Sequence, residues 1–279
     1  MTFREGVIEA AQHRGGIKMQ PCLAVDPAWF AAIQEDVRKL LSQRPPSEVS
    51  QKAHPTNWTN PYGNVTQHSL LNTSGKTEDT TTDHDLRVEG KQFSAPECQA
   101  LARFEAAFEG KAINFRLNGL MAHSGLSPHE ENMIHGDRVR LRFHLPVFTN
   151  KKAKAMLDGE QFHLQAGYIY YFNNGCVHSA GNEGNDARYH VVWDVFLDDW
   201  MEERVCNLDS PATPAEGLRK LSRAEAAKLS DSEPWWIEEY VTYGGQSVKV
   251  PSTWPAKPPR KTFVQALSGL FSGTRNSSF

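Results

Sequence analysis

Apolar residues recur at helical spacing in two stretches near the N-terminus. The first begins at Asp26-Pro27, which has the form of a helix N-cap and a first-turn proline, and it ends before Pro45-Pro46. The second lies between Ser94, a capping residue, and Gly110, a helix stop. We therefore predict two amphipathic helices. The polar segment between them, residues 47–93, is predicted to be either a functional loop or plain surface.

The period changes from helical to alternating after residue 112. Apolar side chains alternate with Asn, Arg and His in Ile113–Asn118 and again in Arg140–Val147, as in strands that have one apolar and one polar face. Turn signals at Asp158-Gly159 and Asn173–Gly175 separate further short strands, the last of which spans Arg188–Phe196. Short strands at this spacing predict a mainly β protein with flanking helices, built on a closed sandwich, jelly roll or barrel.

These patterns divide the chain into three parts. Residues 1–111 are predicted to form helices and a polar loop that pack on the barrel, and residues 112–200 to form the β core. In residues 201–279, Ser222 and Glu225 form a capping-box signature, and Trp235-Trp236 and Phe263–Phe271 offer apolar anchors. Because this last part lacks an evident core of its own, we predict a helical extension packed on the barrel.

Composition narrows the possible partners. The net charge of -3 and the dispersed basic residues provide no patch for phosphate binding, so nucleic acid is not an expected partner. The four cysteines form no CxxC pair, and no stretch approaches the roughly 18 apolar residues of a membrane span. We expect a cytoplasmic protein that acts on a small molecule or a peptide and does not contact a membrane.

Two predicted strands carry cationic or imidazole side chains on their polar faces. One strand presents Arg142 and His144, and the other presents Arg188 and His190. A buried cation needs an anionic partner, and arginine binds a carboxylate through two parallel hydrogen bonds. Facing a barrel interior, these strands would form a pocket for a small dianion. The alternative is that the side chains face solvent on an open sheet.

Further histidines suggest a metal site. His129 and Glu131 are two residues apart, so an extended chain points both side chains to one side, and His178 opens a later strand. Two histidines and one carboxylate leave three coordination positions open, as non-haem Fe(II) oxygenases require. His135 and Asp137 form a rival pair with the same spacing. A single histidine is more often structural than metal-binding.

The chain resembles the aspartyl/asparaginyl β-hydroxylase family, which includes bacterial free-proline hydroxylases and lipid A hydroxylases, over residues 115–199. The resemblance is carried by four segments: His123-Ser124-Gly125 leading to Pro128-His129, Arg140–Pro146, Thr149-Asn150, and His178 with Arg188 ten residues later and Val191–Val195 behind it. It implies a double-stranded β-helix core of the jelly-roll or cupin-like type.

The resemblance also implies site roles. His129 and His178 would be iron ligands, Arg142 and His144 would line a 2-oxoglutarate site, and Arg188 would bind the distal carboxylate of 2-oxoglutarate. Glu131 stands where the family usually has Asp and is expected to ligate as well.

The resulting hypothesis is a dioxygenase that uses Fe(II), 2-oxoglutarate and O2. It would hydroxylate an unactivated C–H bond of an amino acid, peptide or natural product and release succinate and CO2. Two alternatives stay open. A cupin-like metalloenzyme that does not use 2-oxoglutarate would explain the histidines but not the arginines, and in a non-catalytic binding barrel the histidines would be structural.

Overall fold

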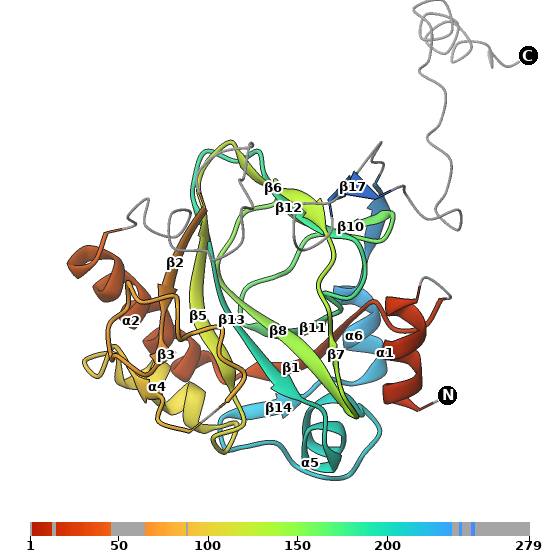
Figure 1. Ribbon diagram of the computed structural model, residues 1–279, viewed down its shortest axis with the longest axis horizontal. Helices are drawn as coiled ribbons and strands as arrows, with labels where there is room; N and C mark the ends of the chain where they lie inside the picture. The colour runs from red at the N-terminus through yellow and green to blue at the C-terminus, as the bar shows by residue number, and fades with distance from the viewer. Residues whose placement is uncertain are drawn as a thin grey trace, which may run out of the picture.

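Two antiparallel sheets form the core of the protein (Figure 1). The computed structural model describes residues 2–12, 15–45, 65–87 and 89–235, and the backbone of 240–241 and 247–248. The larger sheet consists, in order, of β14 (Leu218–Lys220), β1 (Met19–Val25), β11 (Tyr168–Phe172), β8 (Arg138–Phe148), β13 (Arg188–Phe196), β5 (Ile113–Leu120) and β2 (Val65–Ser69), with β7 (Ile134–His135) paired to β8. The smaller sheet consists of β15 (Ser232–Pro234), β10 (Glu160–Phe162), β9 (Ala153–Leu157), β12 (His178–Asn182) and β6 (Ser124–His129).

This arrangement confirms the predicted fold class, a mainly β protein with a double-stranded β-helix core. Two further strand pairs lie outside the main sheets: β3 (Leu71–Asn72) with β4 (Gln92–Phe93), and β16 (Tyr240–Val241) with β17 (Ser247–Val248). The Asp158-Gly159 turn connects β9 to β10 as predicted, with φ angles of 45° and 87°.

Helices flank the core on opposite sides of the view in Figure 1. They are α1 (Phe3–Ala11), α2 (Pro27–Gln43), α4 (Gln99–Ala106), α5 (Asp199–Met201), the π-helix η1 (Glu202–Cys206) and α6 (Arg223–Leu229). The first predicted helix is confirmed, because the Asp26 carboxylate accepts hydrogen bonds from the backbone N–H groups of Ala28 and Trp29. The second starts later than predicted: Ser94 donates to the carbonyl of Ser69 instead of capping α4.

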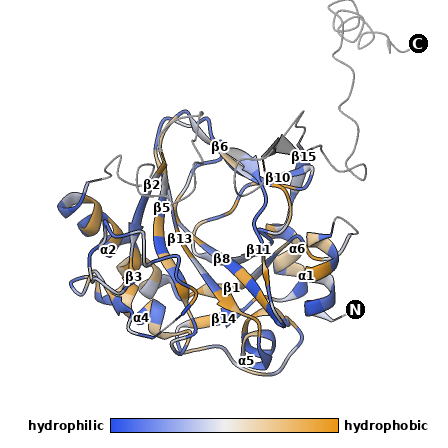
Figure 2. Ribbon diagram, in the orientation of Figure 1, coloured by the Kyte–Doolittle hydropathy of each residue, from blue (hydrophilic) through white to orange (hydrophobic). Residues whose placement is uncertain are grey.

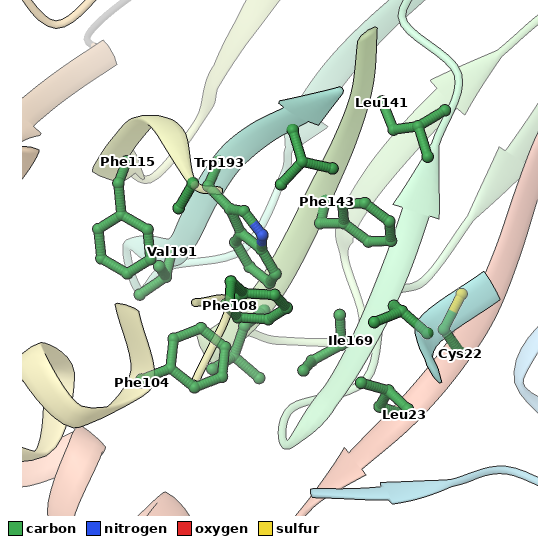
Figure 3. Close-up of a cluster of buried hydrophobic side chains, with 14 of the residues drawn as sticks. Cys22, Leu23, Phe104, Phe108, Phe115, Leu141, Phe143, Ile169, Val191 and Trp193 are labelled. Atoms are coloured by element: carbon green, nitrogen blue, oxygen red, sulfur yellow. The ribbon is translucent and has the colours of Figure 1, made fainter. Parts of the chain in front are cut away.

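An aromatic cluster joins α4 to the larger sheet (Figure 3). Trp193 of β13 packs against Phe104, Phe108 and Phe143, with ring centroids 5.3, 4.9 and 5.6 Å away. Because side chains alternate along a strand, the polar neighbours of these residues point to the opposite face of the sheet. The alternation along β8 is visible as changes of colour in Figure 2. The apolar face therefore supports the polar face on which the site is built.

The terminal parts of the chain contribute more to the sheets than the sequence predicted. The N-terminal part supplies β1 and β2, and the described C-terminal part supplies β14 to the larger sheet and β15 to the smaller one. The two sheets therefore include strands outside residues 112–200, and the described residues after 200 form strands as well as helices. Strand β1 lacks a clean alternation because it contains Pro21 and a register shift beside it. Short edge strands gain their stability from their partners and carry little pattern of their own.

The predicted capping box of Ser222 and Glu225 is confirmed at the start of α6. Trp236 and the Phe263–Phe271 anchors lie outside the described residues, as do residues 47–64 and 88 of the polar segment. No helix in the described part of the chain is long and apolar enough to cross a membrane.

Candidate metal centre and cavity

A cavity of about 310 Å³ lies between the two sheets and is lined by residues of both. The larger sheet contributes polar side chains from β2, β5, β8 and β13. The smaller sheet contributes His129 at the end of β6 and His178 at the start of β12. All three predicted cosubstrate-binding residues, Arg142, His144 and Arg188, line this cavity. The alternative, in which these side chains face solvent on an open sheet, is wrong.

The structure brings His129, Glu131 and His178 together. The potential ligand atoms of these three side chains lie within 4.8 Å of one another. Nε2 of His129 and Nε2 of His178 are each 3.9 Å from Oε1 of Glu131. His129 and His178 are paired residues of neighbouring strands, which fixes their separation. A hydrogen bond of 2.8 Å from the backbone N–H of Glu131 to the carbonyl of Asn174 holds the third residue beside them. Within the described residues, this is the one group of three or more such side chains with metal-binding geometry.

The rival pair is not assembled in the same way. Asp137 is exposed in the turn between β7 and β8, whereas His135 lines the cavity. Of the two pairs with the same spacing, only His129 and Glu131 meet His178. The geometry therefore favours Glu131 over Asp137 as the carboxylate donor.

Protonation suits these three side chains to a divalent metal. Burial and the nearby His129 lower the pKa of His178 to about 3, so its imidazole is neutral at pH 7. Its Nδ1 lies 3.0 Å from the carbonyl oxygen of Cys176, which can only accept, so Nδ1 carries the proton and Nε2 keeps its lone pair. Burial raises the pKa of Glu131, but Arg142 and Arg140 outweigh it and hold the pKa well below its usual range. Two imidazoles and one carboxylate are a donor set typical of iron and similar metals.

A charged network positions Glu131. Arg142 donates to both oxygens of Glu131 and, through Nε, to Oδ1 of Asp194 at 2.8 Å. Arg140 donates to Oε2 of Glu131 at 2.9 Å. Burial lowers the pKa of Arg142, but Asp194 and Glu131 outweigh it and raise the pKa above its usual value. Arg142 therefore lines the cavity with its guanidinium already engaged by two carboxylates.

Arg188 has different surroundings. It is 6% exposed, and no carboxylate of the described residues lies within 4.0 Å of its guanidinium. Burial lowers its pKa to about 10. Its Nη1 lies 3.3 Å from Nδ1 of His190.

The contact with Arg188 sets the tautomer of His190. Because a guanidinium only donates, Nδ1 of His190 accepts, and His190 therefore carries its proton on Nε2. Nδ1 of His144 lies 3.4 Å from the same Nδ1 atom. Both Nε2 atoms are buried without a partner in the described part of the chain. Burial, followed by the charge of Arg188, lowers the pKa of both imidazoles and keeps them neutral.

Asp194 and Arg116 also belong to the site, although the sequence patterns did not point to them. Asp194 is fully buried and lies on β13, where Arg188, His190 and Asp194 occupy alternate positions that share one face. This alternation can be read from the sequence, and it places an acidic residue on the same strand face as Arg188. In the sheet this residue lies opposite Arg142. Arg116 lies on β5 between Asn114 and Asn118, and all three line the cavity.

The fold and the site define a double-stranded β-helix protein whose cavity can hold a metal ion. The chain belongs to the aspartyl/asparaginyl β-hydroxylase family, whose sequence profile matches residues 29–197. This confirms the resemblance and places the chain in a family of hydroxylases.

Similar solved structures include AviO1 from Streptomyces viridochromogenes Tue57, with 12% identity and a TM-score of 0.36 over 76% of this chain and 98% of that one. They also include a prolyl-4-hydroxylase from Pseudomonas putida, with 10% identity and a TM-score of 0.33 over 70% of this chain and 98% of that one. No curated protein matches the sequence.

Proposed function

We propose that this hydroxylase is an Fe(II)- and 2-oxoglutarate-dependent dioxygenase. It hydroxylates an unactivated C–H bond of an amino acid, peptide or natural product and releases succinate and CO2. One observation carries the proposal: a group of two histidines and one carboxylate lines the same cavity as Arg188, a buried cation with no carboxylate partner among the described residues.

His129, Glu131 and His178 would hold the iron and leave three coordination positions for the cosubstrate and O2. When bound, iron and 2-oxoglutarate supply the oxidative decarboxylation that yields succinate, CO2 and the oxygen atom transferred to the substrate. The protein contributes placement and exclusion of water. Arg142 and Arg140 keep Glu131 ionised and in place, and Asp194 holds Arg142 from the other side.

Arg188 would bind the distal carboxylate of 2-oxoglutarate. A buried guanidinium without a counter-ion costs folding free energy, and a carboxylate on it would remove that cost through two charge-assisted hydrogen bonds. The aromatic ring of Phe172 packs against both His178 and His144, with ring centroids 5.6 and 5.1 Å away. His144 and His190 add two neutral imidazoles beside the anion, each with an Nε2 atom that has no partner among the described residues.

The two alternatives fit these contacts less well. A cupin-like metalloenzyme without 2-oxoglutarate accounts for the three metal-binding side chains but leaves Arg188 without an anion. A non-catalytic binding barrel could place an anionic ligand on Arg188 but gives no role to the grouping of His129, Glu131 and His178. The dioxygenase accounts for both.

The test is aerobic incubation of the purified protein with Fe(II), 2-oxoglutarate and a pool of metabolites and peptides. We expect succinate together with a product that gains one oxygen atom. Both should disappear in His178→Ala and when 2-oxoglutarate is omitted. An oxygenated product that forms without 2-oxoglutarate would favour the cupin-like alternative.

A further inference from the structure

One excursion of the chain reaches the cavity from the edge of the larger sheet. It runs from residue 73 to residue 91, with 73–87 and 89–91 described, and its two ends lie side by side because β3 pairs with β4. Two of its side chains, His84 and Leu86, line the cavity. This part of the polar segment 47–93 is therefore not plain surface.

The base of the 73–91 excursion is fastened to β2 and β3. The backbone N–H of Ser69 donates to the carbonyl of Thr77 at 2.8 Å. The side chain of Asn72 donates to the carbonyl of Lys76 and accepts from the backbone N–H of Gly75, each at 2.8 Å. Asparagine side chains hold turns in this way, through hydrogen bonds to nearby backbone groups. The base therefore gives the rest of the excursion a fixed starting point.

The tip of the excursion, residues 83–86, is held by two further side chains. The ammonium group of Lys91 donates to the carbonyl oxygen of Asp83 at 3.0 Å and to that of Asp85. The side-chain amide of Gln67, on β2, donates to the buried carboxylate of Asp83 at 2.9 Å. Because these contacts fix the backbone on both sides of residue 84, they determine where the two cavity-lining side chains lie.

The tip is anchored away from the proposed cosubstrate residues. Arg142 and His144 lie on β8 and Arg188 lies on β13, whereas the tip is bound to β2, the edge strand. The order of these strands is β8, β13, β5, β2, so β2 is at least two strands from the cosubstrate residues, roughly 10 Å between backbones. Under the proposed function, the tip side of the cavity is left for the primary substrate.

Three apolar side chains from different segments line this side of the cavity. Leu86 comes from the excursion, Val65 from the start of β2 and Leu126 from β6, and β2 and β6 contact each other. Burial of apolar surface is favourable and has no directional requirement. Such a wall therefore selects an apolar group of suitable size and discriminates against a polar group of the same shape.

We propose that Leu86 determines substrate specificity by packing against an apolar group of the primary substrate, and that Lys91 is a positioning residue that holds Leu86 there. The substrate class is therefore one with an aliphatic or aromatic group at this end of the cavity, such as an apolar amino-acid side chain, free or within a peptide. This inference deepens the proposed function and rests on it, because the cosubstrate must occupy the Arg188 side for the tip side to hold the substrate.

The test is anaerobic calorimetry on the metal-loaded protein, saturated with 2-oxoglutarate. The titrants are the twenty standard L-amino acids and the peptides Gly-X-Gly with the same side chains. Leucine with asparagine and valine with threonine are pairs of similar shape, so each pair isolates polarity. We expect the apolar member of at least one pair to bind about tenfold or more tightly than the polar member.

Leu86→Asn keeps the approximate shape of the side chain and removes its apolar character. It should reduce the preference for the apolar member by about tenfold, because the substrate group then faces an amide. Ile134→Asn is the matched control, since Ile134 is an exposed aliphatic residue of β7 that does not line the cavity. Its preference should equal that of wild type.

The positioning role of Lys91 has its own readouts. Lys91→Met should reduce the same preference by about threefold or more and speed amide hydrogen exchange in residues 77–87, because the two carbonyl contacts at the tip are lost. Lys91→Arg, which can still donate to both carbonyls, should restore most of each. Wild-type preference and exchange in Lys91→Met would remove this role.

The affinity for 2-oxoglutarate separates this inference from the proposed function and also reports folding. It should change less than about threefold in Leu86→Asn and in Lys91→Met, because Arg188 is untouched. An unchanged preference in Leu86→Asn, tighter binding of the polar members by wild type, or no bound titrant would overturn the proposal. Loss of 2-oxoglutarate in Leu86→Asn would also overturn it, because the tip would then belong to the cosubstrate site. If wild type does not bind 2-oxoglutarate, the proposed function fails, and the same titrations without 2-oxoglutarate still test Leu86.

Discussion

The two pairs of buried arginines in the cavity have opposite surroundings. Arg140 and Arg142, beside the candidate metal ligands, are in contact with the carboxylates of Glu131 and Asp194. Arg116 and Arg188 lie on neighbouring strands and have no carboxylate within 4.0 Å in the described part of the chain. The first pair holds a side chain in place. The second pair has no such carboxylate among the described residues, and under the proposed function Arg188 receives one from 2-oxoglutarate.

The difference also concerns stability. A buried ion pair roughly balances the loss of hydration, whereas a buried charge without a partner is a net cost. Such a cost persists where function requires it, because binding sites are often built at the expense of folding stability. Loss of a paired arginine should therefore lower the free energy of unfolding. Loss of an unpaired arginine should weaken ligand binding and leave the free energy of unfolding unchanged or higher.

The largest effect is expected at the metal ligands. His178→Ala and Glu131→Ala should each weaken Fe(II) binding by more than about 100-fold, because each removes one of three protein ligands. Asp137→Ala is the matched control and should bind iron like wild type, since Asp137 is exposed in the β7–β8 turn. Anaerobic metal titration measures the affinities. Loss of iron in Asp137→Ala with retention in Glu131→Ala would make His135 and Asp137 the ligands.

Loss of a paired arginine should be next in size. Arg142→Gln leaves Glu131 and Asp194 short of a cation and should lower the free energy of unfolding by about 3–5 kcal/mol. Arg188→Met removes a charge that has no carboxylate partner, so the stability of the ligand-free protein should be unchanged or raised by about 1 kcal/mol. Denaturant unfolding without metal or cosubstrate measures both. Equal destabilisation by the two substitutions would mean that the protein itself compensates the charge of Arg188.

The smallest effect is expected at Asp83, and it concerns the pH dependence of the free energy of unfolding. Burial raises its pKa to about 7, although Arg116 and Lys91 oppose the shift. Between about pH 4 and pH 7 the folded protein holds a proton that the unfolded chain releases, so this carboxyl makes the free energy of unfolding fall as the pH rises.

Asp83→Asn lacks this proton. Its stability relative to wild type should therefore increase from pH 5 to pH 8, by at least about 1 kcal/mol. Denaturant unfolding at both pH values measures the difference, with Asp137→Asn as the exposed control. A constant difference would place the pKa of Asp83 near its ordinary value.

The sequence predicted the parts of the molecule that have a strong local pattern. The strands with a clean alternation, such as Arg140–Val147, and the capped helix after Asp26 were found because burial on one face imposes a period. Strands β1, β2, β14 and β15 were missed. They lie at or near the edges of sheets, and their partners, distant in sequence, determine their conformation.

The candidate site was predictable to a similar degree. Spacing and resemblance pointed to His129, Glu131 and His178, and the structure brings these three together. Which arginine is paired and which is free could not be predicted, because it depends on contacts between β8, β13 and β5. Arg142 differs from Arg188 because it has Asp194 as a carboxylate partner. Asp194 lies on β13, the strand next to that of Arg142.

The most direct test of the account is the affinity of the metal-loaded protein for 2-oxoglutarate without O2, compared between wild type and Arg188→Gln. Calorimetry should give a dissociation constant that rises by about 30-fold or more in the variant, because a buried charge-assisted contact is lost. The affinity for Fe(II) should stay unchanged, since Arg188 does not contact the three candidate ligands. An unchanged dissociation constant for 2-oxoglutarate, or no binding to wild type, would contradict the account.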